Sequence, residues 1–348
     1  MIIVDEQLPI VARVLGQYAD VVCVDGRSID RVFLERVQAT ALFIRTVTHI
    51  SNDLIAGTDV RFIASASAGI DHVEDDVRNG TDALVAHAPG CNAQAVSEYV
   101  MTWLRYFDLP RGTTLGVVGF GHVGSLLSRF ACASGMRVLV NDPPLAGIGH
   151  AFPSPVTHVD LDELLHASDV VSLHVPYTEA GLHATRGLIG TTRLAMLKNN
   201  STIINSSRGG IVDETALADH VSSGRLRAVL DVYENEPDVS RQVIEAIRYC
   251  TPHIAGYTQQ AKANASRMVL EAYRRWSGLD MEIPELSQLV GRTMSSGESD
   301  AVILQHPFRQ VWLSDPSIET FNSSRRLTPL RGEHLRPPTW EELHVLRD

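Results

Sequence analysis

The sequence predicts an α/β protein with two doubly wound domains, each built on its own parallel sheet, followed by a small C-terminal appendage. Short β-branched runs alternate with helix-length segments in two successive series, which is typical of parallel sheets covered by helices. The length of 348 residues suits two domains. Beyond Gly278 the alternation stops, and Pro, Ser, Arg and Glu become frequent.

The first series contains short strands that are apolar throughout, as strands buried on both faces are. A helix is expected over residues 93–107, because Val96, Tyr99, Val100 and Trp103 recur at the spacing of one helical face. The strands of this series are expected at residues 2–4, 21–24, 42–44, 62–64 and 84–86.

The second series begins at Thr113, with helices expected over 123–133 and 215–221, and another long helix is expected over 259–276, after its last strand. We predict that the two series form Rossmann-like domains, each with one parallel sheet. The strands of this second series are expected at residues 115–118, 138–140, 170–173, 202–204 and 228–230. The domain boundaries that follow are 1–91 with 256–280 for the first domain, 92–255 for the second, and 281–348 for the appendage.

The segment TTLGVVGFGHVG places Gly119, Gly121 and Gly124 in a G-x-G-x-x-G pattern between a predicted strand and a predicted helix. Gly119 permits the tight turn, Gly121 lets a diphosphate approach the backbone, and Gly124 lets helix and strand pack closely. Asp142 ends the next strand. Its separation from Gly119 along the sequence is close to the roughly 20 residues expected between the glycine motif and the acid that binds the adenosine ribose. Its charge would repel a 2′-phosphate, so NAD is favoured over NADP. The alternatives are a turn that binds nothing and an ordinary loop acid.

Three later segments carry side chains suited to the oxidation of a 2-hydroxy acid. Arg208 follows a predicted strand, Glu236 precedes a proline, and His253 lies in TPHIAG. An arginine fork suits a planar carboxylate, a histidine exchanges protons near neutral pH, and a carboxylate beside it fixes the ring tautomer. Each residue alone is more often a surface ion pair, a structural histidine or a solvated turn. Their order after the glycine motif favours a catalytic trio.

These motifs resemble the D-isomer-specific 2-hydroxyacid dehydrogenase superfamily. A glycine-rich turn, an Arg-Gly segment, a D-V-x-x-x-E-P segment and a T-P-H segment follow one another within residues 116–256. The resemblance assigns the catalytic roles to Arg208, Glu236 and His253. Within the superfamily, APGCNAQAV at 88–96 and TPHIAGYT at 251–258 resemble the erythronate-4-phosphate dehydrogenase branch.

That resemblance implies NAD-dependent oxidation of 4-phospho-D-erythronate to 2-oxo-3-hydroxy-4-phosphobutanoate, in pyridoxal 5′-phosphate biosynthesis. It makes 1–91 with 256–280 the substrate domain, 92–255 the NAD-binding Rossmann domain, and 281–348 a dimerisation region. Substrate contacts are implied for Arg45, Thr46, Ser67 and Tyr257. Cofactor contacts are implied for Gly119, Gly121, His122, Val123, Gly124, Asp142, Val175, Ser206, Ser207, Asp231 and Gly256.

The expected partners are a small phosphorylated 2-hydroxy acid and a second copy of the chain. Apolar residues at 302–304, 311–313 and Trp340 are expected to pack on that second copy. Because Lys198 and Lys262 are the only lysines of the chain, the phosphate anchor is expected to be an arginine. Arg45 is the expected anchor, because it follows the expected strand 42–44 of the substrate domain. The alternatives are that Arg45 forms an ordinary salt bridge, and that tail arginines such as Arg325 and Arg326 reach the site from a partner subunit.

Two other functions are kept open: another 2-hydroxyacid dehydrogenase, of the phosphoglycerate or glyoxylate/hydroxypyruvate type, and a non-enzymatic NAD-sensing scaffold. The formal net charge of −11 argues against a nucleic-acid surface. No apolar run is long enough to span a membrane, and we read no secretory signal. The four cysteines are scattered, which predicts neither a disulfide framework nor a metal site and suits the cytoplasm.

Overall fold

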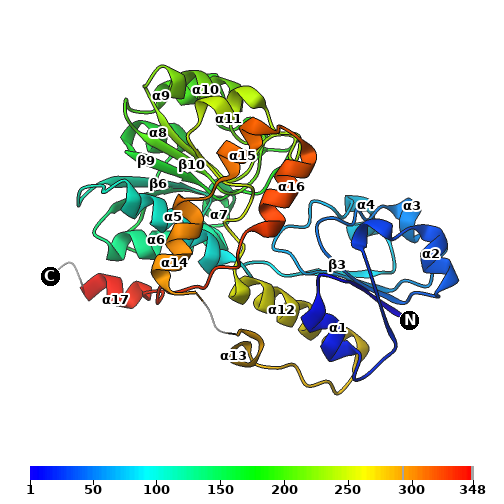
Figure 1. The fold of residues 1–348 in the computed structure, drawn as a ribbon. Helices are drawn as coiled ribbons and strands as arrows, with labels where there is room; N and C mark the ends of the chain where they lie inside the picture. The colour runs from blue at the N-terminus through cyan, green and yellow to red at the C-terminus, as the bar shows by residue number, and fades with distance from the viewer. Residues whose placement is uncertain (292–293, 346–348) are drawn as a thin grey trace. The chain divides into compact units, whose positions relative to one another are not determined.

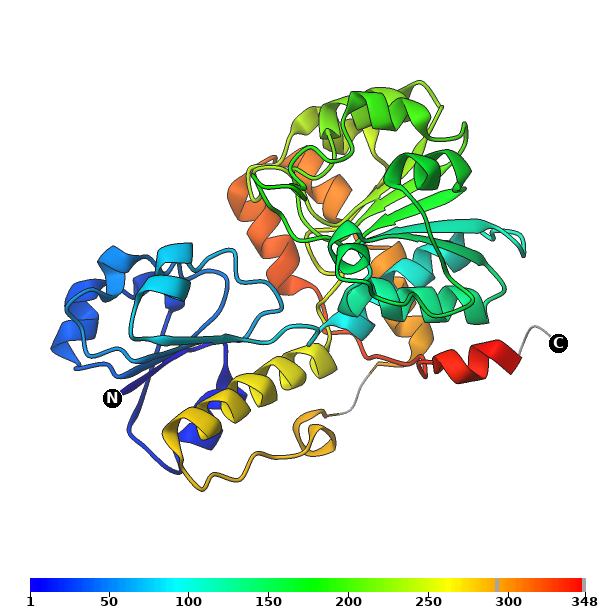
Figure 2. The same cartoon turned by 180° about the vertical axis from the view of Figure 1, so that it is seen from behind.

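The computed structural model describes residues 1–291 and 294–345, with the side chains of 344 and 345 left aside, and it divides into two compact units. Unit 1 comprises Met1–Asn92 and Thr258–Thr293, and unit 2 comprises Ala93–Tyr257 and Met294–Asp348. Each unit has its own parallel sheet with helices packed around it, as Figures 1 and 2 show from opposite sides. The predicted α/β class with two parallel sheets is confirmed.

Unit 1 is built on a five-stranded sheet in the order β2-β1-β3-β4-β5, with every neighbouring pair parallel. Its strands are β1 (Ile2–Asp5), β2 (Val21–Val24), β3 (Ala41–Ile44), β4 (Phe62–Ser65) and β5 (Leu84–His87). Its helices are α1 (Pro9–Leu15), η1 (Gly26–Ser28), α2 (Arg31–Arg36), α3 (Asn52–Ile55), α4 (Asp75–Gly80), α12 (Gln259–Ser277) and α13 (Leu286–Leu289).

The long helix α12 belongs to unit 1, although unit 2 precedes it in the chain. It packs against β4 and β5, and its buried Val269, Leu270 and Tyr273 join Phe43 and Phe62 in one apolar cluster. The rings of Tyr273 and Phe62 meet edge to face with their centroids 5.2 Å apart. The core of unit 1 is therefore closed by a segment from far along the sequence.

Unit 2 is built on a seven-stranded parallel sheet in the order β12-β11-β10-β9-β6-β7-β8. Its strands are β6 (Thr114–Val118), β7 (Arg137–Asn141), β8 (Thr157–His158), β9 (Val170–Leu173), β10 (Thr202–Asn205), β11 (Arg227–Leu230) and β12 (Tyr249–Cys250). Its first helices are α5 (Ala93–Tyr106), α6 (His122–Ala133), α7 (Pro143–Gly147), α8 (Leu161–Ala167), α9 (Thr191–Met196), α10 (Glu214–Ser222) and α11 (Arg241–Ala246). Because the strands are parallel, all their carboxyl ends lie along one edge of the sheet.

The C-terminal segment of unit 2 forms four further helices, which the sequence pattern did not predict: α14 (Ser296–Leu304), α15 (Phe308–Ser314), α16 (Ile318–Leu327) and α17 (Trp340–Val345). They pack on the unit itself, with α14 against α5, α15 against α11 and α17 against α6. Ile303 and Trp312 are buried in the two apolar clusters of unit 2. Two of the side chains expected to pack on a second copy therefore pack within their own unit, whereas Val311 from the same expected set is exposed, and the contact with a second copy stays a prediction.

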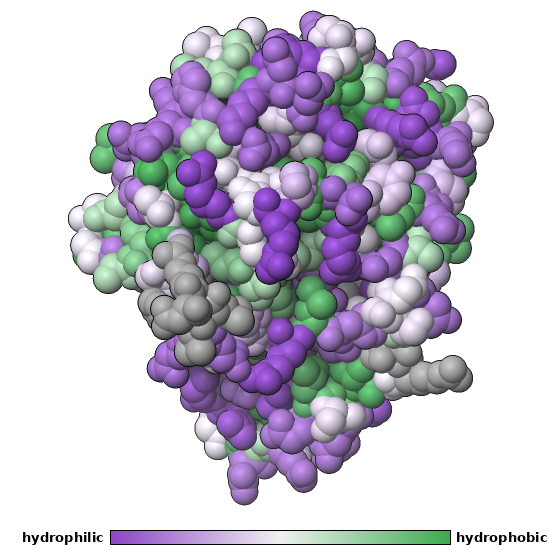
Figure 3. Space-filling view, turned by 90° about the vertical axis from the view of Figure 1, so that its left-hand side faces the viewer, coloured by the Kyte–Doolittle hydropathy of each residue, from purple (hydrophilic) through white to green (hydrophobic). Residues whose placement is uncertain are grey.

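No helix among the described residues is long and apolar enough to span a membrane. Figure 3 shows one face of the molecule, on which hydrophilic side chains are widely spread and hydrophobic ones form several smaller groups between them. That surface agrees with a composition in which charged residues make up 20% of the chain.

The packing of α15 generates a stability prediction. Trp312→Ala should lower the free energy of unfolding of unit 2 by about 3–5 kcal/mol, because a large buried ring is lost from a packed core. Val311→Ala is the matched control on the same helix: Val311 is exposed, and its change should stay within about 0.5 kcal/mol. Denaturant unfolding measures both. Equal stability of the two variants would mean that α15 is only loosely attached to the unit.

Candidate active site

The loops that follow the strands of unit 2 bring most of the predicted site residues to the carboxyl edge of its sheet. Gly119 follows β6, Asp142 follows β7, Arg208 follows β10, and Glu236 and His253 follow β11 and β12. In open parallel sheets, ligands bind at this edge. The three predicted catalytic residues and the dinucleotide motif, which are widely separated in sequence, therefore lie at the edge where chemistry is expected.

The glycine-rich turn has the geometry that a dinucleotide site needs. Gly119 has a φ of +92°, and a Cβ there would lie 2.5 Å from the carbonyl oxygen of His174. A Cβ on Gly124 would lie 1.9 Å from the oxygen of Gly119, so helix and turn can approach only without a side chain. A Cβ on Gly121 would meet nothing within 4 Å. Gly121 also caps α6 without a side-chain hydrogen bond, which leaves the first N–H groups of the helix for an anion.

Asp142 is held beside this turn by its own hydrogen bonds. Its Oδ2 accepts the backbone N–H of Phe120 at 2.7 Å, and its Oδ1 accepts that of Leu145 at 3.0 Å, at the start of α7. The carboxylate therefore stays at the end of β7, next to the glycines. His122 and Val123 lie in the exposed or half-buried first turn of α6, and Val175 follows β9.

The loop after β10 is organised by the buried side chain of Asn205. Its Oδ1 accepts hydrogen bonds from the N–H and hydroxyl of Ser207, and its Nδ2 donates to the carbonyl of Arg208 at 2.8 Å. The Nη1 of Arg208 also donates to the carbonyl of Ser207. The buried hydroxyl of Ser206 has no hydrogen-bond partner within the described part of the chain. Because buried polar atoms are normally paired, this hydroxyl marks a position suited to a ligand.

His253 and Glu236 form a hydrogen-bonded acid–base pair. His253 Nδ1 lies 2.5 Å from Glu236 Oε1, and the two side chains are 30% and 25% exposed. With Nδ1 facing the carboxylate, the other ring nitrogen is left for a substrate proton. The φ of His253 is +57°, an uncommon conformation for a residue with a side chain. The surrounding loop must therefore hold this residue in place.

Asp231 provides that support from the end of β11. Its carboxylate is buried, and it accepts hydrogen bonds from the Thr251 hydroxyl at 2.6 Å and from the N–H groups of Ile254 and Ala255 at 2.7 and 2.8 Å. The Tyr99 hydroxyl continues the chain to Thr251. Burial raises the pKa of Asp231, although these hydrogen bonds act against the rise. The side chain is thus committed to the loop, and a cofactor contact from Asp231 would come from its main chain.

Glu214 is a second buried acid that sequence reasoning missed. It begins α10, and its Oε1 accepts the N–H of Glu234 at 2.6 Å. Burial raises the pKa of Glu214 to about 8, with a smaller contribution in the same direction from the charges of Glu234 and Glu236. The protonated form of Glu214 is thus favoured near neutral pH, which reduces the negative charge beside Glu236.

The substrate residues predicted in unit 1 follow β3 and β4. Arg45 Nε donates to the buried Asp5 at 3.0 Å, while its two Nη groups meet no acceptor in the described part of the chain. Thr46 is exposed, and the Ser67 hydroxyl already bonds to Ser65 and to the carbonyl of Gly69. The predicted site residues Gly256 and Tyr257 are half-buried and belong to unit 2, in the loop after His253.

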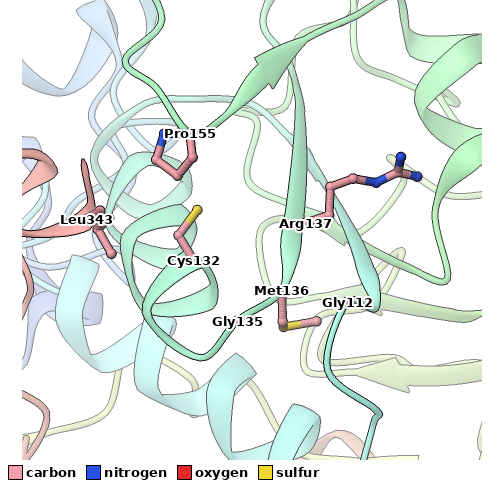
Figure 4. A pocket seen from close by; sticks show the side chains of 7 residues that line it. All are labelled: Gly112, Cys132, Gly135, Met136, Arg137, Pro155 and Leu343. Carbon is pink, nitrogen blue, oxygen red and sulfur yellow. The ribbon is translucent and has the colours of Figure 1, made fainter. Parts of the chain in front are cut away.

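A surface pocket of about 280 Å³ lies elsewhere in unit 2, at the amino ends of β6 and β7. Figure 4 shows its lining side chains, with the guanidinium of Arg137 pointing away from the others. Because the glycine turn and the three predicted catalytic residues lie at the carboxyl ends of the strands, this pocket is not part of the candidate active site.

Comparison with known proteins agrees with this site. The model of the D-isomer specific 2-hydroxyacid dehydrogenase NAD-binding domain matches residues 92–255. Among solved structures, D-lactate dehydrogenase from Aquifex aeolicus, complexed with NAD and lactic acid, is 25% identical with a TM-score of 0.65, over 80% of this chain and 96% of its own. NAD-dependent formate dehydrogenase from Staphylococcus aureus, 19% identical with a TM-score of 0.66 over 82% of this chain and 97% of its own, shares the fold.

Two curated relatives are closer in sequence. Erythronate-4-phosphate dehydrogenase of Marinomonas sp. (strain MWYL1) is 37% identical over 81% of this chain and 74% of its own length. Erythronate-4-phosphate dehydrogenase of Photorhabdus laumondii subsp. laumondii is also 37% identical, over 100% of this chain and 95% of its own. The chain therefore belongs to the erythronate-4-phosphate dehydrogenase family, within the D-isomer-specific 2-hydroxyacid dehydrogenase superfamily.

Proposed function

We propose that this chain catalyses the NAD-dependent oxidation of 4-phospho-D-erythronate to 2-oxo-3-hydroxy-4-phosphobutanoate. The observation that carries the proposal is the 2.5 Å contact between His253 Nδ1 and Glu236 Oε1, at the same sheet edge as Arg208 and the glycine turn. An acid–base pair, a guanidinium and a dinucleotide motif are the groups that oxidation of a 2-hydroxy acid requires. The names of the curated relatives support the choice of substrate.

The proposed mechanism gives each member of the trio one task. The guanidinium of Arg208 binds the substrate carboxylate and so fixes the carbon that is oxidised. His253 Nε2 accepts the hydroxyl proton, while Glu236 orients the ring through Nδ1 and stabilises its protonated form. Bound NAD supplies the acceptor for the hydride that leaves the same carbon.

The residues that would hold NAD line the sheet edge around the glycine turn. The open space at Gly121, the uncapped start of α6 and the unpartnered Ser206 hydroxyl fit this cofactor. Asp142 would bind the adenosine ribose, and its negative charge would oppose the 2′-phosphate of NADP. The remaining proposed contacts are Gly119, His122, Val123, Gly124, Val175, Ser207, the main chain of Asp231, and Gly256.

We propose Arg45 as the anchor of the substrate phosphate. Asp5 holds its Nε at 3.0 Å, which leaves the two Nη groups to form charge-assisted hydrogen bonds with phosphate oxygens. Thr46, Ser67 and Tyr257 are the proposed neighbours of the substrate. The Ser67 hydroxyl already donates to the carbonyl of Gly69. It would therefore accept a hydrogen bond from the substrate, or rotate away from Gly69 and donate one to it.

We also propose that the chain acts as a cytoplasmic homodimer. The four cysteines, all within the described residues, form no disulfide, which suits a reducing compartment. Three exposed apolar side chains on α15 and α16 are available to a second copy: Val311, which was expected there, and Ile318 and Leu327, which were not.

The substrate assignment predicts a clear order of activities. Purified protein should reduce NAD with 4-phosphoerythronate, and kcat/KM should be at least about tenfold higher than with 3-phosphoglycerate or glycerate. NADP should be a poor cofactor, because Asp142 meets its phosphate with like charge. Absorbance of the reduced cofactor measures each rate. A higher kcat/KM for 3-phosphoglycerate would assign the chain to another 2-hydroxy acid. Cofactor binding without turnover of any of these acids would favour the sensing scaffold.

The acid–base pair predicts graded losses of turnover. His253→Ala should lower kcat by about 10²–10⁴-fold, because the departing proton loses its positioned acceptor. Glu236→Gln should act more weakly, since the amide can still contact the ring but carries no charge. Steady-state kinetics measures both, with the exposed His166→Ala as the control variant. The dissociation constant for NAD should stay within about twofold in all three, and full activity in His253→Ala would exclude the mechanism.

The phosphate anchor predicts an effect confined to phosphorylated substrate. Arg45→Ala should raise the KM for 4-phosphoerythronate by about tenfold or more, which corresponds to a lost charge-assisted contact of about 1.5–3 kcal/mol. The slow turnover of unphosphorylated erythronate should barely change. Arg31→Ala is the matched control, because Arg31 also pairs with an acid in unit 1, at 2.9 Å from Glu35. Equal losses on both substrates would remove Arg45 from the phosphate site.

A further inference from the structure

Arg331 is a buried cation in the C-terminal segment, in the extended stretch between α16 and α17 (Figure 1). Only 1% of the residue is exposed, and no acidic side chain forms an ion pair with it among the described residues. Its Nη2 instead donates to two successive backbone carbonyls, those of Ile254 at 3.2 Å and of Ala255. These two residues come directly after His253. The C-terminal segment therefore contacts the backbone of the candidate catalytic loop.

Asp231 binds the same two residues through their N–H groups. Its two carboxylate oxygens accept the amides of Ile254 and Ala255 at 2.7 and 2.8 Å, and its carbonyl accepts the N–H of His253 at 2.7 Å. Each of the two residues thus gives its N–H to a carboxylate and its carbonyl to a guanidinium. Attraction between these buried opposite charges tightens the arrangement, because both lie in a medium of low dielectric constant.

We propose that Arg331 is a positioning residue for His253, and this inference rests on the proposed function of His253 as the proton acceptor. The left-handed backbone at His253 is followed by the clamped residues, so their placement sets where the ring lies relative to Glu236. A misplacement of about 1 Å at a catalytic group can cost about 100-fold in rate. Arg331 lies outside residues 92–255, so the contribution comes from beyond the matched NAD-binding domain.

Arg309 offers a matched control in the same C-terminal segment. Its Nε and Nη2 donate to the carbonyls of Ile244 at 3.0 Å and Glu245 at 2.8 Å, both in the last turn of α11. It is therefore an arginine that also bonds two successive carbonyls, away from the loop of His253. A purely structural role for such arginines predicts the same kinetic result for Arg331→Met and Arg309→Met.

The test compares Arg331→Met, Arg331→Lys and Arg309→Met in the full-length chain. Arg331→Met should lower kcat by about 10- to 100-fold while KM and the dissociation constant for NAD change by less than about twofold. Arg331→Lys should lie between this variant and the wild type, since one ammonium cannot reproduce the planar fork. Arg309→Met should keep kcat within about twofold of the wild type.

Hydrogen exchange gives a second measurement that needs no substrate. The amides of Ile254 and Ala255 should exchange about tenfold faster in Arg331→Met, because the loop opens more often. Their exchange rates in Arg309→Met should equal those of the wild type. If the wild type did not oxidise 4-phosphoerythronate, the proposed function would fail while exchange still tested the clamp. Wild-type kcat with unchanged exchange in Arg331→Met would overturn the proposal, as would equal kcat losses in the two methionine variants. Should Arg331→Met not fold, Arg331→Lys decides by the same two measurements.

Discussion

The buried carboxylate of Asp231 is the interaction on which the catalytic edge of unit 2 depends. A carboxylate removed from water is costly unless hydrogen bonds and an opposite charge compensate it. Here the Thr251 hydroxyl and the amides of Ile254 and Ala255 fill its oxygens, and Arg331 lies across the loop. The contacts that offset the cost of burying this carboxylate are the same contacts that fix the shape of the loop. Disturbing either charge therefore disturbs the backbone that carries His253.

Strand order explains why the loops that carry the three proposed catalytic residues lie at one edge of the sheet. β10, β11 and β12 are consecutive neighbours in the sheet, so the loops after them leave the same edge side by side. Gly209 strengthens this arrangement, because a Cβ there would lie 1.9 Å from the Tyr233 carbonyl. The backbone beside Arg208 therefore touches the loop that leads to Glu236. Local packing of two backbone segments thus fixes the loop after β10 against the loop after β11.

Much of the fold followed from the sequence because buried parallel strands are apolar throughout and long helices have a clear periodicity. The strands β2 and β9 lie where they were expected, and α5 and α12 end within one residue of the expected positions. The edge strands β8 and β12 were not predicted, because two residues are too few to form a recognisable run of apolar residues. The helices α14–α17 were missed because they are short, and their apolar residues are buried by neighbours distant in sequence.

The residues of the candidate site likewise fall into some that the sequence predicts and some that it does not. Glycines and the order of motifs predicted residues that share one sheet edge, since those residues are tied to chain direction and strand ends. The supporting groups Glu214, Tyr99 and Arg331 could not be predicted, because their importance comes from burial and from partners far along the chain. A buried arginine in a polar tail looks in sequence like any solvated one.

The placement of α12 has a consequence for how the chain is made. A ribosome releases the five strands of unit 1 long before it releases the helix that covers Phe43 and Phe62. Residues 93–257 are synthesised between the strands of unit 1 and α12, so during that time the apolar face that α12 covers stays exposed. Closing that face is a long-range contact, which slows folding. A nascent chain that stops before α12 therefore lacks the side chains Val269, Leu270 and Tyr273 that complete this apolar cluster.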